Sequence, residues 1–197
     1  VYCTREPGGT GIGDQIREVL HNIHNIAMDP VTEILLYSAS RAQHTAQVIK
    51  PMLAEGKIVL CDRYADSTFA YQGFGRGLNM DTLRTITKFA TQNLKPTLTI
   101  YLDLPVEVGL SRKKEANQAG RGELNRMDRL TVEFYRRVRQ GYLSMARDEP
   151  ERWRVIDARQ SVQDIHHSIC AAVAQLNLTG DTSRPGRQPA AGLSPTP

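Results

Sequence analysis

The sequence has 197 residues, of which 40% are apolar, and it carries a formal net charge of +4. This length is enough for one domain with a sizeable core, and no apolar run approaches the roughly 18 residues needed to cross a bilayer. The three cysteines lie far apart and match neither a disulfide framework nor a zinc-ligand spacing, so we expect a cytoplasmic protein in which Cys3 and Cys61 are small core residues.

Short β-rich runs alternate with longer helical patterns, which is typical of a parallel sheet covered by helices. The sequence therefore predicts a three-layer α/β domain, with strands over residues 1–3, 58–61, 98–103 and 153–156. Polar, Gly or Pro residues follow each strand, where an open parallel sheet places its ligand crevice. We expect the functional residues just after the strands.

Helix signals separate these strands. Asp29 and Pro30 provide an N-cap and a first helical position, Gly56 ends that stretch, and Pro51 kinks or splits it. Further helices are predicted over 81–93 with Asp81 as cap, over 106–116, over 128–145, and from a capping box at Ser161 and Asp164 to about residue 176. From residue 179 the composition turns to Gly, Pro, Ser and Thr, so we expect a domain over 1–176 and a disordered tail over 177–197.

Two early motifs suggest nucleotide chemistry. Residues 4–10 read T-R-E-P-G-G-T after the first strand, without the G-x-G-x-x-G spacing of a dinucleotide fingerprint, and a simple turn explains the peptide equally well. Tyr37 and Arg41 lie one helical turn apart, so a ring and a guanidinium on one face could stack on a base and bond its edge. On spacing alone, a core tyrosine beside a surface arginine fits better.

The sharpest motif ends the second strand. Asp62-Arg63-Tyr64 places an acid and a base at the carboxyl edge of the sheet, where Asp62 can hold Mg²⁺ and Arg63 can bind phosphate bidentately. A structural ion pair is the alternative. Four polar side chains of the next helix share one face: they are Ser67, Thr68, Tyr71 and Gln72. They could hydrogen-bond the edge of a pyrimidine base, although an ordinary polar helix end would look the same.

A basic cluster lies between residues 112 and 139 and is interrupted by Gly120 and Gly122. Arginines on such a hinged segment suit a lid that closes over phosphates. For Arg136, Arg137 and Arg139 we favour a solvated helical face. A nucleic-acid patch is disfavoured because the loop has no aromatic residues to stack on bases.

The fourth strand ends in a short loop. Residues 155–159 read V-I-D-A-R, and such a loop could touch an adenine ring, although the segment alone is only a strand end.

In order and spacing, these motifs resemble the bacterial thymidylate kinase family, which has a P-loop kinase-like α/β fold. The resemblance covers residues 1 to about 176 and is carried by T-R-E-P-G-G-T, S-R-A-Q-H, D-R-Y with A-Y-Q-G-F-G-R-G, Y-L-D-L-P-V-E-V-G-L and R-G-E-L-N-R. It implies transfer of the ATP γ-phosphoryl group to dTMP with Mg²⁺, no nucleic-acid or membrane partner, and a homodimer.

The resemblance also implies a role for each matching residue. Tyr37 would stack on thymine, Arg41 would bond its edge, Thr68 and Gln72 would lie near the base, and Tyr71 would lie against the sugar. The further implied roles are the monophosphate contacts Arg63 and Arg76, the Mg²⁺ ligand Asp62, the pocket wall Glu6 and Pro7, the catalytic lid arginines Arg121 and Arg126, and the adenine loop Asp157, Ala158 and Arg159.

One family feature is missing from the printed sequence, which contains no G-x-x-x-x-G-K-[ST]. We expect the family's first, central strand and its P-loop to be absent, which would leave two strands with open edges and a chain with little kinase activity of its own. The alternatives are another deoxynucleoside or nucleotide kinase, a non-catalytic nucleotide-binding fragment and, ranked last, a basic nucleic-acid binder.

Overall fold

The computed structural model describes residues 1–122 and 125–176. The expected tail over 177–197, and two residues of the basic segment, lie outside these ranges. Within them, no helix is both long and apolar enough to span a membrane.

Four strands form, as the sequence predicts, with ends shifted by one or two residues. They are β1 (Tyr2–Arg5), β2 (Val59–Asp62), β3 (Thr99–Asp103) and β4 (Trp153–Asp157). β1 pairs in parallel with β2, and β3 with β4, whereas no β2–β3 pairing occurs among the described residues. The expected open edges on β2 and β3 are therefore present. The two strands of each pair end side by side, because Arg5 lies opposite Asp62 and Asp103 lies opposite Asp157.

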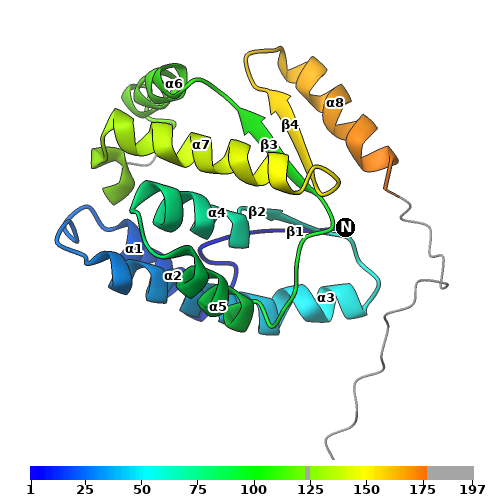
Figure 1. Cartoon of the computed structure of the whole chain (residues 1–197), viewed down its shortest axis with the longest axis horizontal. Helices are drawn as coiled ribbons and strands as arrows, with labels where there is room; N and C mark the ends of the chain where they lie inside the picture. Colours follow the sequence, from blue (N-terminus) through cyan, green and yellow to red (C-terminus); the bar gives the residue numbers. More distant parts are fainter. Residues whose placement is uncertain (123–124, 177–197) are drawn as a thin grey trace, which may run out of the picture.

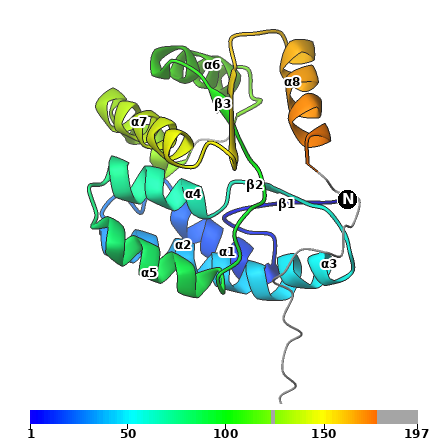
Figure 2. The same ribbon diagram turned by 45° about the vertical axis from the view of Figure 1, so that its right-hand side comes forward.

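Several helices of the first half of the chain pack against the β1–β2 pair. The helices of this half are α1 (Gly11–His21), α2 (Pro30–His44), η1 (Thr45–Ile49), α3 (Lys50–Ala54), α4 (Ala65–Thr68), η2 (Phe69–Gly75) and α5 (Met80–Ala90). Figures 1 and 2 show α1, α2, α3 and α5 beneath the β1–β2 pair. The side chain of Asp29 accepts from Val31 N, which confirms the predicted start of α2.

The second half packs helices on both sides of the β3–β4 pair. They are α6 (Val106–Gln118), the short 3₁₀ helix η3 (Arg126–Arg129), α7 (Val132–Asp148) and α8 (Val162–Ala174). Both views place α8 on one side of the pair and α6 and α7 on the other. Ser161 Oγ accepts from Asp164 N, so the predicted cap of α8 is confirmed.

Three local predictions are wrong. The single helix expected over 128–145 is two, because Asn125 caps η3 and Thr131 caps α7 through its own bond from Phe134 N. Asn79 rather than Asp81 caps α5, since its side chain accepts from Thr82 N. Cys3 is exposed because it lies on the uncovered face of β1.

The two halves meet along α7 and η2. Phe134 and Val138 of α7 pack against Ala70 of η2 and Met127 of η3 in one buried cluster. A polar contact adds to this: Arg152 donates to both carboxylate oxygens of Asp66 on α4, at 2.7 and 2.9 Å, and Thr99 at the start of β3 donates to the same carboxylate. The elements that carry the candidate site are therefore in contact across the two halves of the chain.

Candidate active site

The carboxyl ends of β1 and β2 bring two of the predicted motifs together. Glu6 follows β1 directly, and its backbone N–H donates to the carbonyl of Asp62, the last residue of β2, at 2.9 Å. The T-R-E-P-G-G-T and D-R-Y motifs are thus neighbours at one edge of the sheet, although their arginines, Arg5 and Arg63, are 58 positions apart in the sequence. This is the placement that the strand pattern predicts.

A buried ion pair connects that edge to α2. The Glu6 carboxylate accepts from Arg41 Nε at 2.8 Å and lies 3.1 Å from His44 Nδ1, and the Glu6 and Arg41 side chains are each only 3% exposed. Arg41 also donates to Thr68 Oγ1 at 2.8 Å and to the Tyr64 carbonyl at 3.3 Å. The Glu6–Pro7 peptide bond is cis, and the Pro7 carbonyl accepts from Arg17. Because Arg41 bonds Glu6 after β1 and the Tyr64 carbonyl after β2, the loops that follow both strands hold its guanidinium.

A second buried carboxylate lies two turns earlier on the same helix. Glu33 accepts from Gln72 Nε2 at 2.8 Å, from Arg76 at 2.9 Å and from Arg126 at 2.6 Å. Burial alone would raise the pKa of Glu33, but the hydrogen bonds from Arg76, Gln72 and Arg126 outweigh it, so the pKa lies below its ordinary value. Glu33 is thus an ionised carboxylate inside the protein.

Tyr37 lies between these two bonded pairs on α2, one turn from Glu33 and one turn from Arg41. Burial, with a further contribution from the Glu33 charge, raises the pKa of Tyr37 to about 12, so its phenol stays neutral at physiological pH. Its ring is half-buried. An aromatic face flanked on two sides by amide, hydroxyl and guanidinium groups is suited to a planar heterocycle.

Arg63 and Asp62 lie at the exposed rim of this region. The Arg63 guanidinium lies over the Tyr71 ring at 5.1 Å and donates to the Tyr71 hydroxyl at 3.3 Å. Its backbone has φ of 64°, an unusual conformation for a non-glycine residue that turns the chain sharply after β2. Asp62 is exposed and makes no ion pair with any described residue, so the structural Asp-Arg ion pair considered as an alternative does not form.

The predicted phosphate and lid arginines occupy different environments. Arg76 and Arg126 share the Glu33 carboxylate, and Arg126 is 5% exposed and also donates to the Leu20 carbonyl. Arg121 is exposed. The solvated face expected for α7 holds for Arg136, whereas Arg139 instead forms a two-pronged ion pair with Asp103 because it faces the end of β3.

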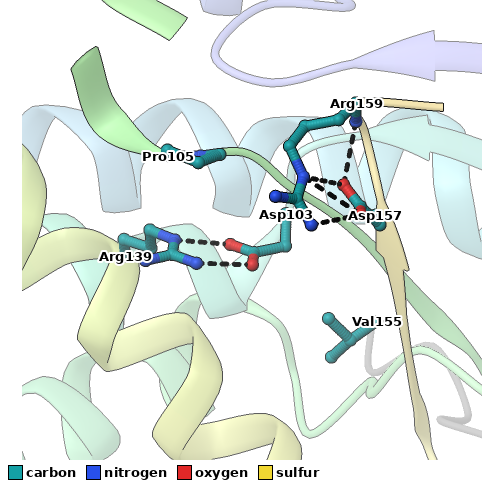
Figure 3. A pocket seen from close by; sticks show the side chains of 6 residues that line it. All are labelled: Asp103, Pro105, Arg139, Val155, Asp157 and Arg159. Atoms are coloured by element: carbon teal, nitrogen blue, oxygen red, sulfur yellow. Dashed lines mark hydrogen bonds and ion pairs between the residues drawn. The ribbon is translucent and has the colours of Figure 1, made fainter. Parts of the chain in front are cut away.

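A cavity of about 330 Å³ opens at the ends of β3 and β4 (Figure 3). Its lining includes two ion pairs, Arg139 with Asp103 at 2.7 Å and Arg159 with Asp157 at 2.7 Å. Hydrogen bonds from the Arg159 side chain lower the pKa of Asp157 to about 2. The N–H of Ala158 donates to the Asp103 carbonyl, which fixes the loop onto the neighbouring strand. Asp157 and Arg159 of the predicted adenine loop line this cavity, whereas Ala158 does not.

Sequence reasoning did not single out Glu33, His44 or Asp103, and it assigned Arg139 to a solvated helical face rather than to a pair with Asp103. The spacing of Glu33 to Tyr37 and Arg41 at four-residue intervals was a usable signal, since all three share one helix face. Asp103 ends a strand as Asp62 does. The partners of His44 and Arg139 come from segments about 36 to 40 residues away, which no local pattern identifies.

Comparison with known proteins gives a consistent result. The family model described as thymidylate kinase matches residues 1–169. The thymidylate kinase of Geotalea uraniireducens (strain Rf4) is 51% identical over 174 residues, covering 88% of this chain and 82% of that protein. That of Roseiflexus castenholzii (strain DSM 13941 / HLO8) is 49% identical over 181 residues, covering 88% and 79%.

A solved structure agrees with these sequence matches. The crystal structure of thymidylate kinase from Ehrlichia chaffeensis superposes with a TM-score of 0.67 at 29% identity, covering 87% of this chain and 79% of that one. The fold is therefore that of the P-loop kinase-like α/β proteins. On the matches of sequence and structure together, this chain belongs to the thymidylate kinase family, whose members phosphorylate dTMP.

Proposed function

We propose that this chain binds dTMP as the phosphoryl acceptor of a dTMP kinase reaction. In that reaction the γ-phosphoryl group of ATP is transferred to dTMP, giving dTDP and ADP, with Mg²⁺ as cofactor. The observation that carries the proposal is the half-buried Tyr37 ring between the Arg41–Thr68 and Glu33–Gln72 bonded pairs. A pyrimidine stacked on this ring has donors and acceptors within reach of its edge. Catalysis then requires positioning and charge neutralisation, with no covalent intermediate.

The acceptor nucleotide extends from Tyr37 towards the rim. Arg41 bonds the edge of the base and Thr68 and Gln72 lie near it, while Tyr71 limits the space beside the sugar. Arg63 and Arg76 bind the monophosphate. Tyr71 helps because its ring and hydroxyl hold the Arg63 guanidinium in place. Glu6 and Pro7 form the wall behind Arg41.

The donor side uses the strand ends and the basic segment. The exposed Asp62 carboxylate fits Mg²⁺, which takes one or two protein carboxylates and completes its shell with water and substrate phosphates. When bound there, Mg²⁺ would offset the charge of the phosphate oxygens. Arg121 and Arg126 contribute positive charge from the lid, and the cavity beside Asp157, Ala158 and Arg159 receives the adenine ring.

Binding is the first test. Isothermal titration calorimetry of the 197-residue chain should show dTMP binding that Tyr37→Ala weakens by about 10- to 100-fold, the scale of losing a stacked base. Phe89→Ala, which removes an 86% exposed ring on α5, is the matched control and should bind dTMP as the parent does. Absence of dTMP binding by the parent would contradict the proposal, and tighter binding of thymidine than of dTMP would favour a deoxynucleoside kinase.

Turnover is the second test. The printed sequence contains no G-x-x-x-x-G-K-[ST], and the backbone and lysine of that motif cradle the β- and γ-phosphates in P-loop enzymes. We therefore expect a polypeptide of these 197 residues to bind dTMP but to phosphorylate it very slowly with ATP and Mg²⁺. Turnover in the usual kinase range of about 1–100 s⁻¹ would refute this expectation.

A homodimer is also proposed, supported by exposed apolar side chains on adjoining helices. Ile12 and Val19 on α1 and Val31 and Leu35 on α2 are each 45–55% exposed. Light scattering after size-exclusion chromatography should give twice the chain mass, and Leu35→Glu should reduce it. A monomeric mass for the parent chain would contradict the dimer.

A further inference from the structure

The carboxylate of Glu33 is saturated with donors. Its Oε1 accepts from Gln72 Nε2 at 2.8 Å and from Arg76 Nε at 3.3 Å, and its Oε2 accepts from Arg76 at 2.9 Å and from Arg126 at 2.6 Å. The side chain has no exposed surface. Four hydrogen bonds on two oxygens account for the lone pairs of this group, so Glu33 has no capacity left for a ligand. Its effect on a substrate must pass through its partners.

The charge state of Glu33 decides how Gln72 is oriented. Two guanidinium groups surround the carboxylate and keep it ionised. An ionised carboxylate only accepts hydrogen bonds, so the Gln72 amide must present its NH₂ group to Glu33. The carbonyl and the NH₂ of a free glutamine side chain could exchange places, but here the exchange would put two acceptors against each other. Gln72 therefore has one allowed amide orientation.

That orientation leaves the Gln72 carbonyl oxygen as the available atom. Among residues 1–122 and 125–176, no donor is hydrogen-bonded to Gln72 Oε1, although the residue is only 2% exposed. Arg41 of α2 bonds Thr68 and Glu33 of α2 bonds Gln72, so α2 and the segment of α4 and η2 run in opposite directions, and Tyr37 lies on α2 between the two bonded pairs. Gln72 thus offers an acceptor beside the ring on which the base would stack.

We propose that Glu33 is a specificity-determining positioning residue, which locks Gln72 as a hydrogen-bond acceptor and so selects a pyrimidine whose N3 carries a hydrogen. The inference rests on the proposed binding of dTMP to this site. Thymine and uracil both have an N3–H donor, whereas the N3 of cytosine is an acceptor and would face the Gln72 oxygen unpaired. A buried polar group left without a partner is a strong source of discrimination.

The test is the ratio of dissociation constants for three deoxynucleotides that carry the same monophosphate: dTMP, dUMP and dCMP. In Glu33→Gln the new amide can donate as well as accept, so the Gln72 amide can turn over. The preference for dTMP over dCMP should then fall by about 10-fold, the scale of one such hydrogen bond, while the dTMP to dUMP ratio stays unchanged. Any disturbance of Arg76 affects all three ligands equally and cancels in the ratios.

Glu107→Gln is the matched control, because it removes an exposed carboxylate that also pairs with an arginine, Arg136. It should leave all three affinities unchanged. Gln72→Met provides a second test that does not disturb the charges, and it should reduce the preference for dTMP over dCMP to the same extent even if Glu33→Gln does not fold.

The outcomes separate this inference from the proposed function. If the parent chain binds none of the three nucleotides, the proposed function is overturned, and this inference with it. If the parent binds dTMP but a folded Glu33→Gln or Gln72→Met variant keeps the parent's dTMP to dCMP ratio, only this inference is overturned. An equal loss of affinity for all three ligands would mean that Glu33 has a purely structural role.

Discussion

Two carboxylates, Glu6 and Glu33, are buried on either side of Tyr37, and each is bound by arginine. A carboxylate in such a place is tolerated because charged hydrogen bonds replace the water it has lost. The partners of the two carboxylates lie on α2, on η2 and the residue after it, and on η3, so the carboxylates fix the positions of side chains that come from separate parts of the chain.

Replacing Arg41 should reveal how much the protein depends on one such pair. Arg41→Met keeps most of the aliphatic stem but leaves Glu6 with only His44 beside it, so the free energy of unfolding should fall by about 3–5 kcal/mol. Urea denaturation measures this. Arg136→Met, which breaks exposed pairs, should change the free energy by less than about 1 kcal/mol, and an equally small change for Arg41→Met would contradict the role given to Glu6.

The lowered pKa of Glu33 has a defined effect on acid stability. The side chain binds its proton less readily in the folded protein than in the unfolded chain, so its contribution to stability is complete above about pH 4.5 and is lost as the pH falls through the lower folded pKa. Urea midpoints measured from pH 7 to pH 3 should therefore drop more steeply below pH 4.5 in the parent than in Glu33→Gln. Parallel curves for the two proteins would exclude this contribution.

At the scale of the elements, α7 and η2 approach closely because each offers a glycine to a phenylalanine of the other. Gly75 on η2 faces Phe134, and Gly141 on α7 faces Phe74. A Cβ on Gly141 would lie 2.6 Å from the Phe74 ring and 2.9 Å from its Cβ, which is too close for contact without movement of η2.

Gly141→Ala should therefore destabilise the protein, although alanine normally stabilises a helix interior. Overpacking costs about 1–3 kcal/mol, against a gain of about 1 kcal/mol in helix propensity. Gly109→Ala on α6 is the matched control, since its nearest atom is Leu104 Cδ2 at an ordinary 3.6 Å, and it should raise stability by up to about 1 kcal/mol. Stabilisation by both substitutions in urea denaturation would disprove the close contact.

The sequence predicted those elements whose signals are local. Alternating apolar runs located all four strands, and Asp29 and Ser161 located two helix starts, because a cap bonds only to its own first turn. The π-helical geometry of η2, which packs against α7, was not predicted. The break before Thr131 was missed although its signal is local, since Thr131 accepts from Phe134 N in its own first turn. Likewise, Tyr37 and Arg41 could be paired by spacing, whereas the Arg126–Glu33 contact joins residues 93 positions apart.

At the scale of the whole molecule, the two sheet pairs leave apolar side chains open to water. Leu60 on β2 is 52% exposed and Leu102 on β3 is 47% exposed, and neither strand pairs on its second edge within the described residues. Unpaired strand edges with apolar side chains are sites of association. We therefore predict that these exposed strand edges give the chain a low solubility.

We expect the chain to bind the dye ANS strongly in native buffer, and we expect Leu60→Ser with Leu102→Ser to reduce the fluorescence substantially. Val162→Ser, which removes an 84% exposed side chain from α8, is the control and should leave the signal nearly unchanged. Weak ANS fluorescence from the parent chain would show that these strands do not form an accessible apolar surface.

The contact between Asp66 and Arg152 joins residues 86 positions apart, and this separation has a consequence for synthesis on the ribosome. At about 5–20 residues per second, Asp66 would be made roughly 4–17 s before its arginine. During that interval Thr99 can already donate to the carboxylate but the charge of Arg152 is missing, so we expect α4 to pack less firmly against β3 until Arg152 has been made. Slower translation of the segment between them should lengthen the period in which the nascent chain is open to proteases and chaperones.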